Sequence, residues 1–132
     1  MEVSCAFPTA LDSPDNIALA ERMGYDRAWV YDTPQQSPDV WMTLALAAER
    51  TERIGLGPGV LVPSLRHPMV NAAATATHPR GPSTCPSSSA RSARRAELAA
   101  HGVTEIVFQP CGPDVAGELE RFLAAATEGN TS

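Results

Sequence analysis

The sequence contains no lysine, so all ten of its basic residues are arginine, and 15 acidic residues leave a net charge of −5. A chain this acidic lacks the basic surface that nucleic acids and anionic membranes bind, and neither is expected as a partner. No apolar run approaches the roughly 20 residues that span a bilayer. A strand-like run at Val3–Phe7 leaves no room for a signal peptide. We therefore expect a cytoplasmic protein.

Cysteine is scarce as well. The three cysteines, Cys5, Cys85 and Cys111, cannot all pair and do not have the spacing of metal ligands. The sequence also lacks a nucleophile–base motif. These absences predict a reduced protein without a metal site. A small flavodoxin-like domain is an alternative, but it needs a glycine-containing phosphate loop after the first strand, where the sequence reads Phe7-Pro8-Thr9-Ala10.

What the sequence does contain is an alternation of strand and helix signals. With 43% hydrophobic and 19% charged residues, most of the chain should be globular. Strands are predicted at 3–7, 28–31 and 54–62, with helices at 13–23, 37–53 and 68–77. This order at short spacing predicts parallel strands joined by right-handed crossovers.

Helix boundaries have clear signals. Ser13-Pro14-Asp15 is typical of an N-cap, a first-turn proline and an acid near the helix start, and Gly24 is typical of a helix end. The same start signal recurs at Ser37-Pro38-Asp39, and that helix is predicted to end near Arg53. In the third strand Pro58 removes a ladder donor, so a bulge or distortion is expected there.

The second half of the chain differs in composition. Residues 78–93 contain three prolines, five serines and no aliphatic residue larger than alanine, and are predicted to form a flexible segment. A helix at 94–101, a strand at 103–108 and a last helix should follow. Three parts are thus expected, at 1–77, 78–93 and 94–132. The last helix is predicted to have one apolar face, formed by Val115, Leu119, Phe122 and Ala126.

Several motifs of the sequence point to one known family when they are taken together. These motifs are Gly24-Tyr25-Asp26-Arg27-Ala28-Trp29-Val30-Tyr31-Asp32, Asp39-Val40-Trp41, Leu44-Ala45-Leu46-Ala47-Ala48-Glu49-Arg50-Thr51, Ile54-Gly55-Leu56-Gly57-Pro58-Gly59-Val60, Arg66-His67-Pro68 and Gly102-Val103-Thr104-Glu105-Ile106-Val107-Phe108-Gln109-Pro110. Their combination resembles the luciferase-like monooxygenase superfamily, and most of all its deazaflavin-dependent branch, which includes methylenetetrahydromethanopterin reductases. The resemblance covers residues 1–77 well and extends to the last helix–strand–helix unit.

The resemblance implies an α/β fold of the (β/α)₈ TIM-barrel type, which needs roughly 250 residues. The chain has 132, so we expect a partial barrel of about four parallel strands, with an internal deletion at 78–93. The third and C-terminal strands could pair directly. The implied function is an oxidoreductase or monooxygenase that uses coenzyme F-420 or FMN on a small organic substrate. The alternative is a non-catalytic fragment, or a half-barrel that self-associates through exposed strand edges.

The resemblance also implies where the cofactor binds. Asp32, at the end of the second strand, would lie beside the flavin or deazaflavin ring; the alternative is an acid that caps a loop turn. Gly59 and Val60 would form a bulge with a cis peptide bond behind the ring, whereas an ordinary Gly-Pro-Gly kink is the other interpretation. Trp41, one turn into its helix, is a candidate for the pocket wall.

Arg66 and His67 precede the helix that begins at Pro68. A helix N-terminus next to arginine can hold a phosphate or a carboxylate. The simpler interpretation is that both residues only set the entry to the helix. No residue is assigned as catalytic, because hydride chemistry belongs to the cofactor.

Overall fold

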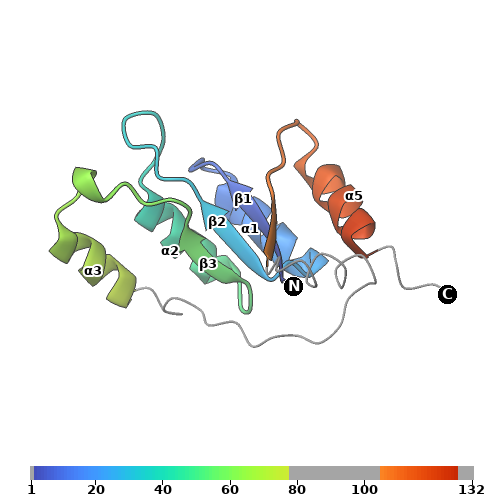
Figure 1. The fold of residues 1–132 in the computed structure, drawn as a ribbon, viewed down its shortest axis with the longest axis horizontal. Coiled ribbons are helices and arrows are strands. Elements are labelled where there is room, and N and C mark those ends of the chain that lie inside the picture. Colours follow the sequence, from blue (N-terminus) through green and yellow to red (C-terminus); the bar gives the residue numbers. More distant parts are fainter. Residues whose placement is uncertain (1, 78–104, 128–132) are drawn as a thin grey trace.

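The computed structural model describes residues 2–77 and 105–127. The predicted segment 78–93, the helix at 94–101 and the first two residues of the C-terminal strand lie outside these residues. The elements, labelled in Figure 1, are β1 (Glu2–Phe7), α1 (Ser13–Met23), β2 (Arg27–Val30), α2 (Val40–Arg50), β3 (Gly55–Pro58), a short 3-10 helix (Pro63–Leu65), α3 (Pro68–Thr77), β4 (Glu105–Phe108) and α5 (Val115–Thr127).

The four strands form one sheet in the order β3-β2-β1-β4, and every neighbouring pair is parallel. The predicted parallel α/β architecture is therefore confirmed. A direct pairing of the third and C-terminal strands is wrong, because β4 pairs with β1 at the opposite edge. The last helix explains this placement: α5 packs on α1, and the Tyr25 hydroxyl donates a buried hydrogen bond of 3.0 Å to the Leu119 carbonyl.

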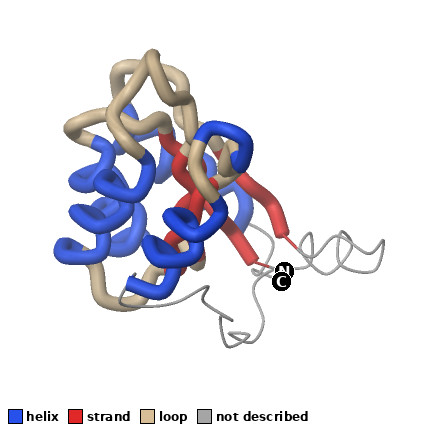
Figure 2. Tube along the Cα trace, turned by 90° about the vertical axis from the view of Figure 1, so that its left-hand side faces the viewer, coloured by secondary structure: helices blue, strands red, loops and turns tan. Residues whose placement is uncertain are grey.

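Helices α1, α2 and α5 cover one face of the sheet, and most of the helical turns lie on one side of the strands in Figure 2. Strand residues on this face alternate with those on the other, as a parallel sheet requires. The helix-covered face forms the apolar core. Its fully buried members include Val3, Cys5, Phe7, Ile17, Ala28, Val30, Val40, Leu44 and Leu119.

The N-cap of the first helix lies one residue earlier than predicted. Asp12 occupies the N-cap position, and Ser13 is the first helical residue. The Ser13 hydroxyl instead donates to the Pro8 carbonyl at 2.7 Å and accepts from the Ala10 N–H at 3.1 Å, so it fastens the loop before the helix. At the other end Gly24 adopts a φ of 96°, and its predicted role as the helix stop is confirmed.

The second helix is capped by Asp39 and not by Ser37, since the Asp39 carboxylate accepts from the Trp41 and Met42 N–H groups at 2.8 and 3.2 Å. It ends at Arg50, three residues before the predicted end. Glu21 of α1 accounts for this early end, because its carboxylate accepts from the backbone N–H groups of the next turn. These donors are Glu52, Arg53 and Ile54.

Strand β3 tolerates its proline for a simple reason. Gly55 and Gly59 donate their N–H groups toward β2, so the alternation of the backbone directs the Leu56 and Pro58 nitrogens to the outer edge. The missing Pro58 N–H therefore removes no bond to β2, and the strand ends there. Beyond it α3 buries none of its residues. Figure 1 shows α3 on the side of the β3 edge of the sheet and α5 on the side of the β4 edge.

Candidate functional site at the carboxyl ends of β2 and β3

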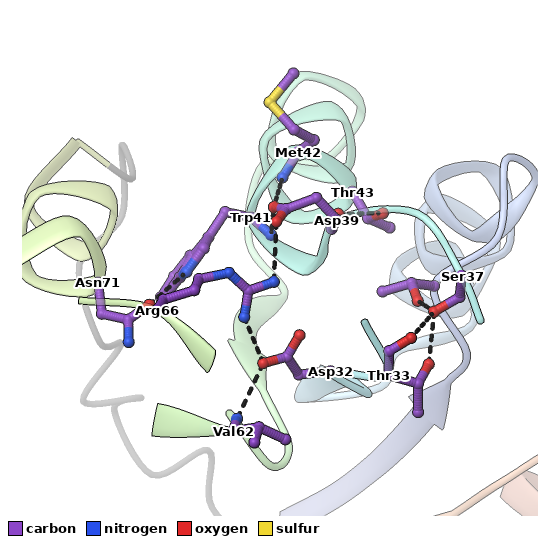
Figure 3. Close-up of polar contacts among 11 residues, drawn as sticks. Asp32, Thr33, Ser37, Asp39, Trp41, Met42, Thr43, Val62, Arg66 and Asn71 are labelled. Atoms are coloured by element: carbon purple, nitrogen blue, oxygen red, sulfur yellow. Dashed lines mark hydrogen bonds and ion pairs between the residues drawn. The ribbon is translucent and has the colours of Figure 1, made fainter. Parts of the chain in front are cut away.

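Asp32 follows β2 directly and is only 6% exposed. Its Oδ2 accepts a hydrogen bond of 2.9 Å from the Val62 N–H and one of 2.6 Å from Arg66. Both partners belong to the segment after β3, so the carboxyl ends of the two strands meet at one carboxylate (Figure 3). In parallel α/β folds the carboxyl ends of strands are where ligands bind.

Arg66 connects three loops through two ion pairs. One end of its guanidinium pairs with Asp32, and the other pairs with Asp39 Oδ2 at 2.9 Å. The other carboxylate oxygen of Asp39 caps α2, so a single arginine connects the end of β2, the start of α2 and the segment after β3 (Figure 3). The cluster of Asp32, Asp39 and Arg66 carries one negative charge overall.

The charges in this cluster hold each other in place. Burial raises the pKa of Asp32, but hydrogen bonds from Arg66 and the Val62 N–H, together with the Arg66 charge, outweigh it and leave the pKa below its ordinary value. Burial acts in the same way on Asp39, whose pKa is also lowered overall by Arg66 and the helix N–H groups. The two carboxylates in turn raise the pKa of Arg66. At neutral pH both acids are ionised.

Gly59 and Val60 lie at the same end of the sheet. The peptide bond between them is cis, as the resemblance implies. Val60 is 78% exposed. The glycines of this strand are needed because the Trp29 indole lies against them: a Cβ at Gly57 would be 2.9 Å from Trp29 Cζ3, and a Cβ at Gly59 would be 3.0 Å from Trp29 Cβ.

Trp41 and His67 connect to α3. The half-buried Trp41 indole donates to the Asn71 side chain at 3.2 Å and so joins α2 to α3 (Figure 3). His67 is exposed, and its Nδ1 accepts from the Met69 N–H at 3.2 Å. In this structure His67 sets the entry to its helix, which is the simpler of the two interpretations of this residue.

A hydroxyl cluster beside Asp32 was not predicted. Ser37 lies 2.5 Å from the Thr33 hydroxyl and donates to the Thr33 carbonyl at 3.0 Å, and Thr9 donates to Ser37. These contacts fasten the loop after β1 to the loop after β2. The only sequence signal for this cluster is that small polar residues follow each strand.

The face of the sheet opposite α1, α2 and α5 (hereafter the uncovered face, because these three described helices all lie on the other side) carries a second group of polar residues that sequence reasoning missed. Arg27 pairs with Glu2 at 3.0 Å, and Glu105 accepts from Ser4 and, at 3.1 Å, from the Trp29 indole. The strand registers place all five on the face opposite the helices. Alternation of polar and apolar residues in β1 and β2 is the signal that could have revealed them.

The structure thus brings Asp32, Arg66 and the Gly59–Val60 segment to one end of the sheet, with Trp41 and His67 at its margin. Residues 2–77 and 105–127 contain no group of three or more histidine, cysteine or acidic side chains placed to hold a metal ion. In the same residues no helix is long and apolar enough to cross a membrane.

Comparisons with known proteins found relatives of part of the chain. The family model of luciferase-like monooxygenases matches residues 12–78. A 5,10-methylenetetrahydromethanopterin reductase of Methanopyrus kandleri is 39% identical over 70 residues, which are 50% of this chain and 20% of the relative. An uncharacterized protein of Mycobacterium tuberculosis is 36% identical over 71 residues, or 53% of this chain and 20% of the relative.

A solved structure shows similarity in three dimensions as well. The coenzyme F-420 dependent tetrahydromethanopterin reductase of Methanopyrus kandleri superposes with a TM-score of 0.54 at 27% sequence identity. The match covers 78% of this chain and 30% of the reductase. The aligned segments span about a fifth of the length of the curated relatives.

Proposed function

The chain belongs to the luciferase-like monooxygenase family, and from this we propose that it forms one side of the cofactor site of a flavin- or deazaflavin-dependent oxidoreductase. The observation that carries the proposal is the junction of Asp32, Val62 and Arg66, which fixes the loops after β2 and β3 at the end of the sheet where such sites lie. The substrate would be a small organic molecule.

The bound cofactor would supply the hydride or activate oxygen, and the chain's own residues would position it. Gly59 and the exposed Val60 offer backbone and an apolar side chain to a flat ring. Asp32 would lie at the ring margin as a fixed carboxylate, because Arg66 and the Val62 N–H already hold it in one orientation. Trp41 would close the wall toward α3.

The residues present fit the ring of such a cofactor better than its phosphate. Arg66 already pairs with two carboxylates, and His67 is occupied by the start of α3. Their cluster with Asp32 and Asp39 does not attract an anion, because two acids outweigh one arginine. We therefore propose that Arg66 and His67 contribute by holding the loops around the ring, and that the phosphate binds elsewhere.

Coenzyme F-420 is the favoured cofactor, since the similar reductase structure is named as dependent on it. FMN is the alternative. The experiment is a fluorescence titration of the purified, monodisperse chain with each of them. We expect saturable quenching with coenzyme F-420 at a lower concentration than with FMN.

Gly59→Leu sharpens this test. A leucine at this position would collide with Trp29 and cover the surface offered to the ring, so binding should be lost while the helix content measured by circular dichroism stays nearly unchanged. Leu46→Ala on the outer side of α2, where Leu46 is 43% exposed, is the control and should bind as the original chain does. Unchanged binding by Gly59→Leu would remove the assignment of this segment.

A non-catalytic fragment is the second candidate, favoured by the short span of the chain relative to its relatives. It predicts no quenching by either cofactor from a folded, monodisperse sample. Binding without turnover would place the chain between the two candidates, as a cofactor-binding protein that lacks the rest of its pocket.

A further inference from the structure

The two edge strands of the sheet, β3 and β4, run in the same direction. Within residues 2–77 and 105–127 no strand pairs with the outer side of β3 or of β4. Because all four strands are parallel, the outer edge of β3 in one molecule can continue into β4 of another in the same sense. A parallel edge left open in this way readily pairs with another chain.

We infer that two copies of this chain associate into one eight-stranded parallel barrel, in which β3 of each copy pairs with β4 of the other. A two-fold axis along the barrel makes both new contacts identical and leaves no edge unpaired, so the assembly stops at two copies. Four strands from each copy give the eight that such a barrel requires. The inference does not depend on whether the chain binds a cofactor.

The uncovered face of the sheet is suited to becoming the barrel interior. Its carboxylates already have partners within one copy, as Glu2 has Arg27 and Glu105 has Ser4 and Trp29. Closure would therefore bury no unpaired acid. The Arg27 Nε is buried without a hydrogen-bond partner among the described residues, so this face retains a donor for an acceptor from the opposite copy.

The edge strand β4 presents an apolar side chain on the same face. Val107 is 49% exposed and stands beside Ser4 in the register with β1. The opposite edge strand has glycine at this face, at Gly55 and Gly57, and the Trp29 indole lies against Gly57. Val107 of one copy would therefore meet the apolar surface of Trp29 in the other.

Closure would also complete the candidate site. The two-fold axis runs along the barrel, so the loops after β2 and β3 of both copies meet at the same end. Each copy would contribute Asp32 and Val60 to one side of a shared opening at the carboxyl ends of the strands. In a single copy the side of this opening that faces these residues has no wall from the sheet.

The first measurement is the mass of the original chain by light scattering during size-exclusion chromatography. We expect a particle of twice the 14.0 kDa chain mass. A monomer at every concentration would overturn the inference, and so would a series of larger species, because these would mean that the edges join without closing.

Val107→Lys places a charge at the new contact while leaving the helix-covered core untouched. It should give a folded monomer by circular dichroism and light scattering. Leu46→Lys is the matched control, because Leu46 is 43% exposed on α2, on the helix side of the sheet, and should remain a dimer. A Val107→Lys dimer would exclude the proposed pairing of edges.

Amide hydrogen exchange tests the contact without relying on a variant. The Leu56 N–H points to the outer edge of β3, whereas the Ala28 N–H lies in the inner part of the sheet. Leu56 should become protected as protein concentration rises, and Ala28 should be protected throughout. Rapid exchange of the Leu56 N–H in a dimer would contradict the assembly. Protection of Leu56 in a monomer would contradict it as well, because another segment of the same chain would then cover the edge.

Discussion

The two faces of the sheet are built by different interactions. Toward the helices, strand residues such as Val3, Phe7 and Val30 are at most 2% exposed and belong to one cluster of buried apolar side chains. On the other face, and at the strand ends that border it, charged and hydrogen-bonding side chains contact one another across strands. A barrel interior is more often filled by bulky branched residues.

This difference assigns separate tasks to the two faces. Burial of apolar side chains provides most of the free energy of folding, and here it is concentrated under α1, α2 and α5. The polar pairs of the other face add little net stability each, but they fix the positions of side chains and loops. The helix-covered face therefore stabilises the fold, whereas the uncovered face and the strand ends that border it position the residues of the candidate site.

The largest loss is expected on the helix-covered face. Leu44→Ala removes a fully buried side chain from the centre of α2, and the cavity left behind should lower the free energy of unfolding by about 2–5 kcal/mol. Urea denaturation measures this loss. Leu46→Ala in the same helix starts from 43% exposure and should cost less than about 1 kcal/mol. Equal losses would contradict the assignment of the core to this face.

Arg66→Gln should produce the next largest effect, at the strand ends. It leaves Asp32 with one fewer partner and removes a charge-assisted bond from Asp39, so we expect a loss of about 1.5–3 kcal/mol in unfolding experiments. The control is Arg50→Gln. Arg50 pairs with Asp15 at 2.6 Å, but the two side chains are 43% and 73% exposed, and such surface pairs contribute at most about 1 kcal/mol.

The same cluster predicts a pH dependence. The pKa values of Asp32 and Asp39 are lowered in the folded protein, so their stabilising effect is complete above the ordinary aspartate pKa of about 3.9 and is lost as the pH falls through the lowered values. The difference in stability between the original chain and Arg66→Gln should be constant near neutral pH and shrink below about pH 4. A difference that grows on acidification would contradict the pairing.

Local signals in the sequence were enough to predict the existence and parallel order of the helices and strands in residues 2–77, although not all of their ends. Gly24 and the alternation of apolar residues work over a few positions, so they can be recognised without knowing the fold. The N-cap of α2 shows the limit of such signals: Ser37 and Asp39 are both good caps, and the choice of Asp39 depends on Arg66, which is 27 residues away.

Contacts across strands were not predictable in this way. Nothing local to β4 says that it pairs with β1, because that choice depends on how α5 packs against α1. The pairing of Arg66 with two carboxylates likewise requires three loops to be in place. The Trp29 ring lies on the uncovered face against Gly57 and Gly59, and only the register of β2 with β3 reveals this contact.

Gly57→Ala tests that contact on the uncovered face. The added methyl group would stand 2.9 Å from Trp29 Cζ3, so the ring must shift, and we expect a loss of about 1 kcal/mol with a change in tryptophan emission. A double-mutant cycle with Trp29→Phe isolates the contact, since the smaller ring should reduce the cost of the alanine. If the cost is the same in both backgrounds, the ring does not lie on β3.

The smallest effect is expected for Tyr25→Phe, which removes the buried hydrogen bond from Tyr25 to α5. The Leu119 carbonyl lies inside α5, where it also accepts the helical bond, so the substitution leaves no orphaned acceptor and should cost about 0.5 kcal/mol. Tyr31→Phe is the control, because Tyr31 is only half-buried at the end of β2. A loss near that of Leu44→Ala would mean that this one bond, and not the apolar contact of Leu119 with the core, keeps β4 beside β1.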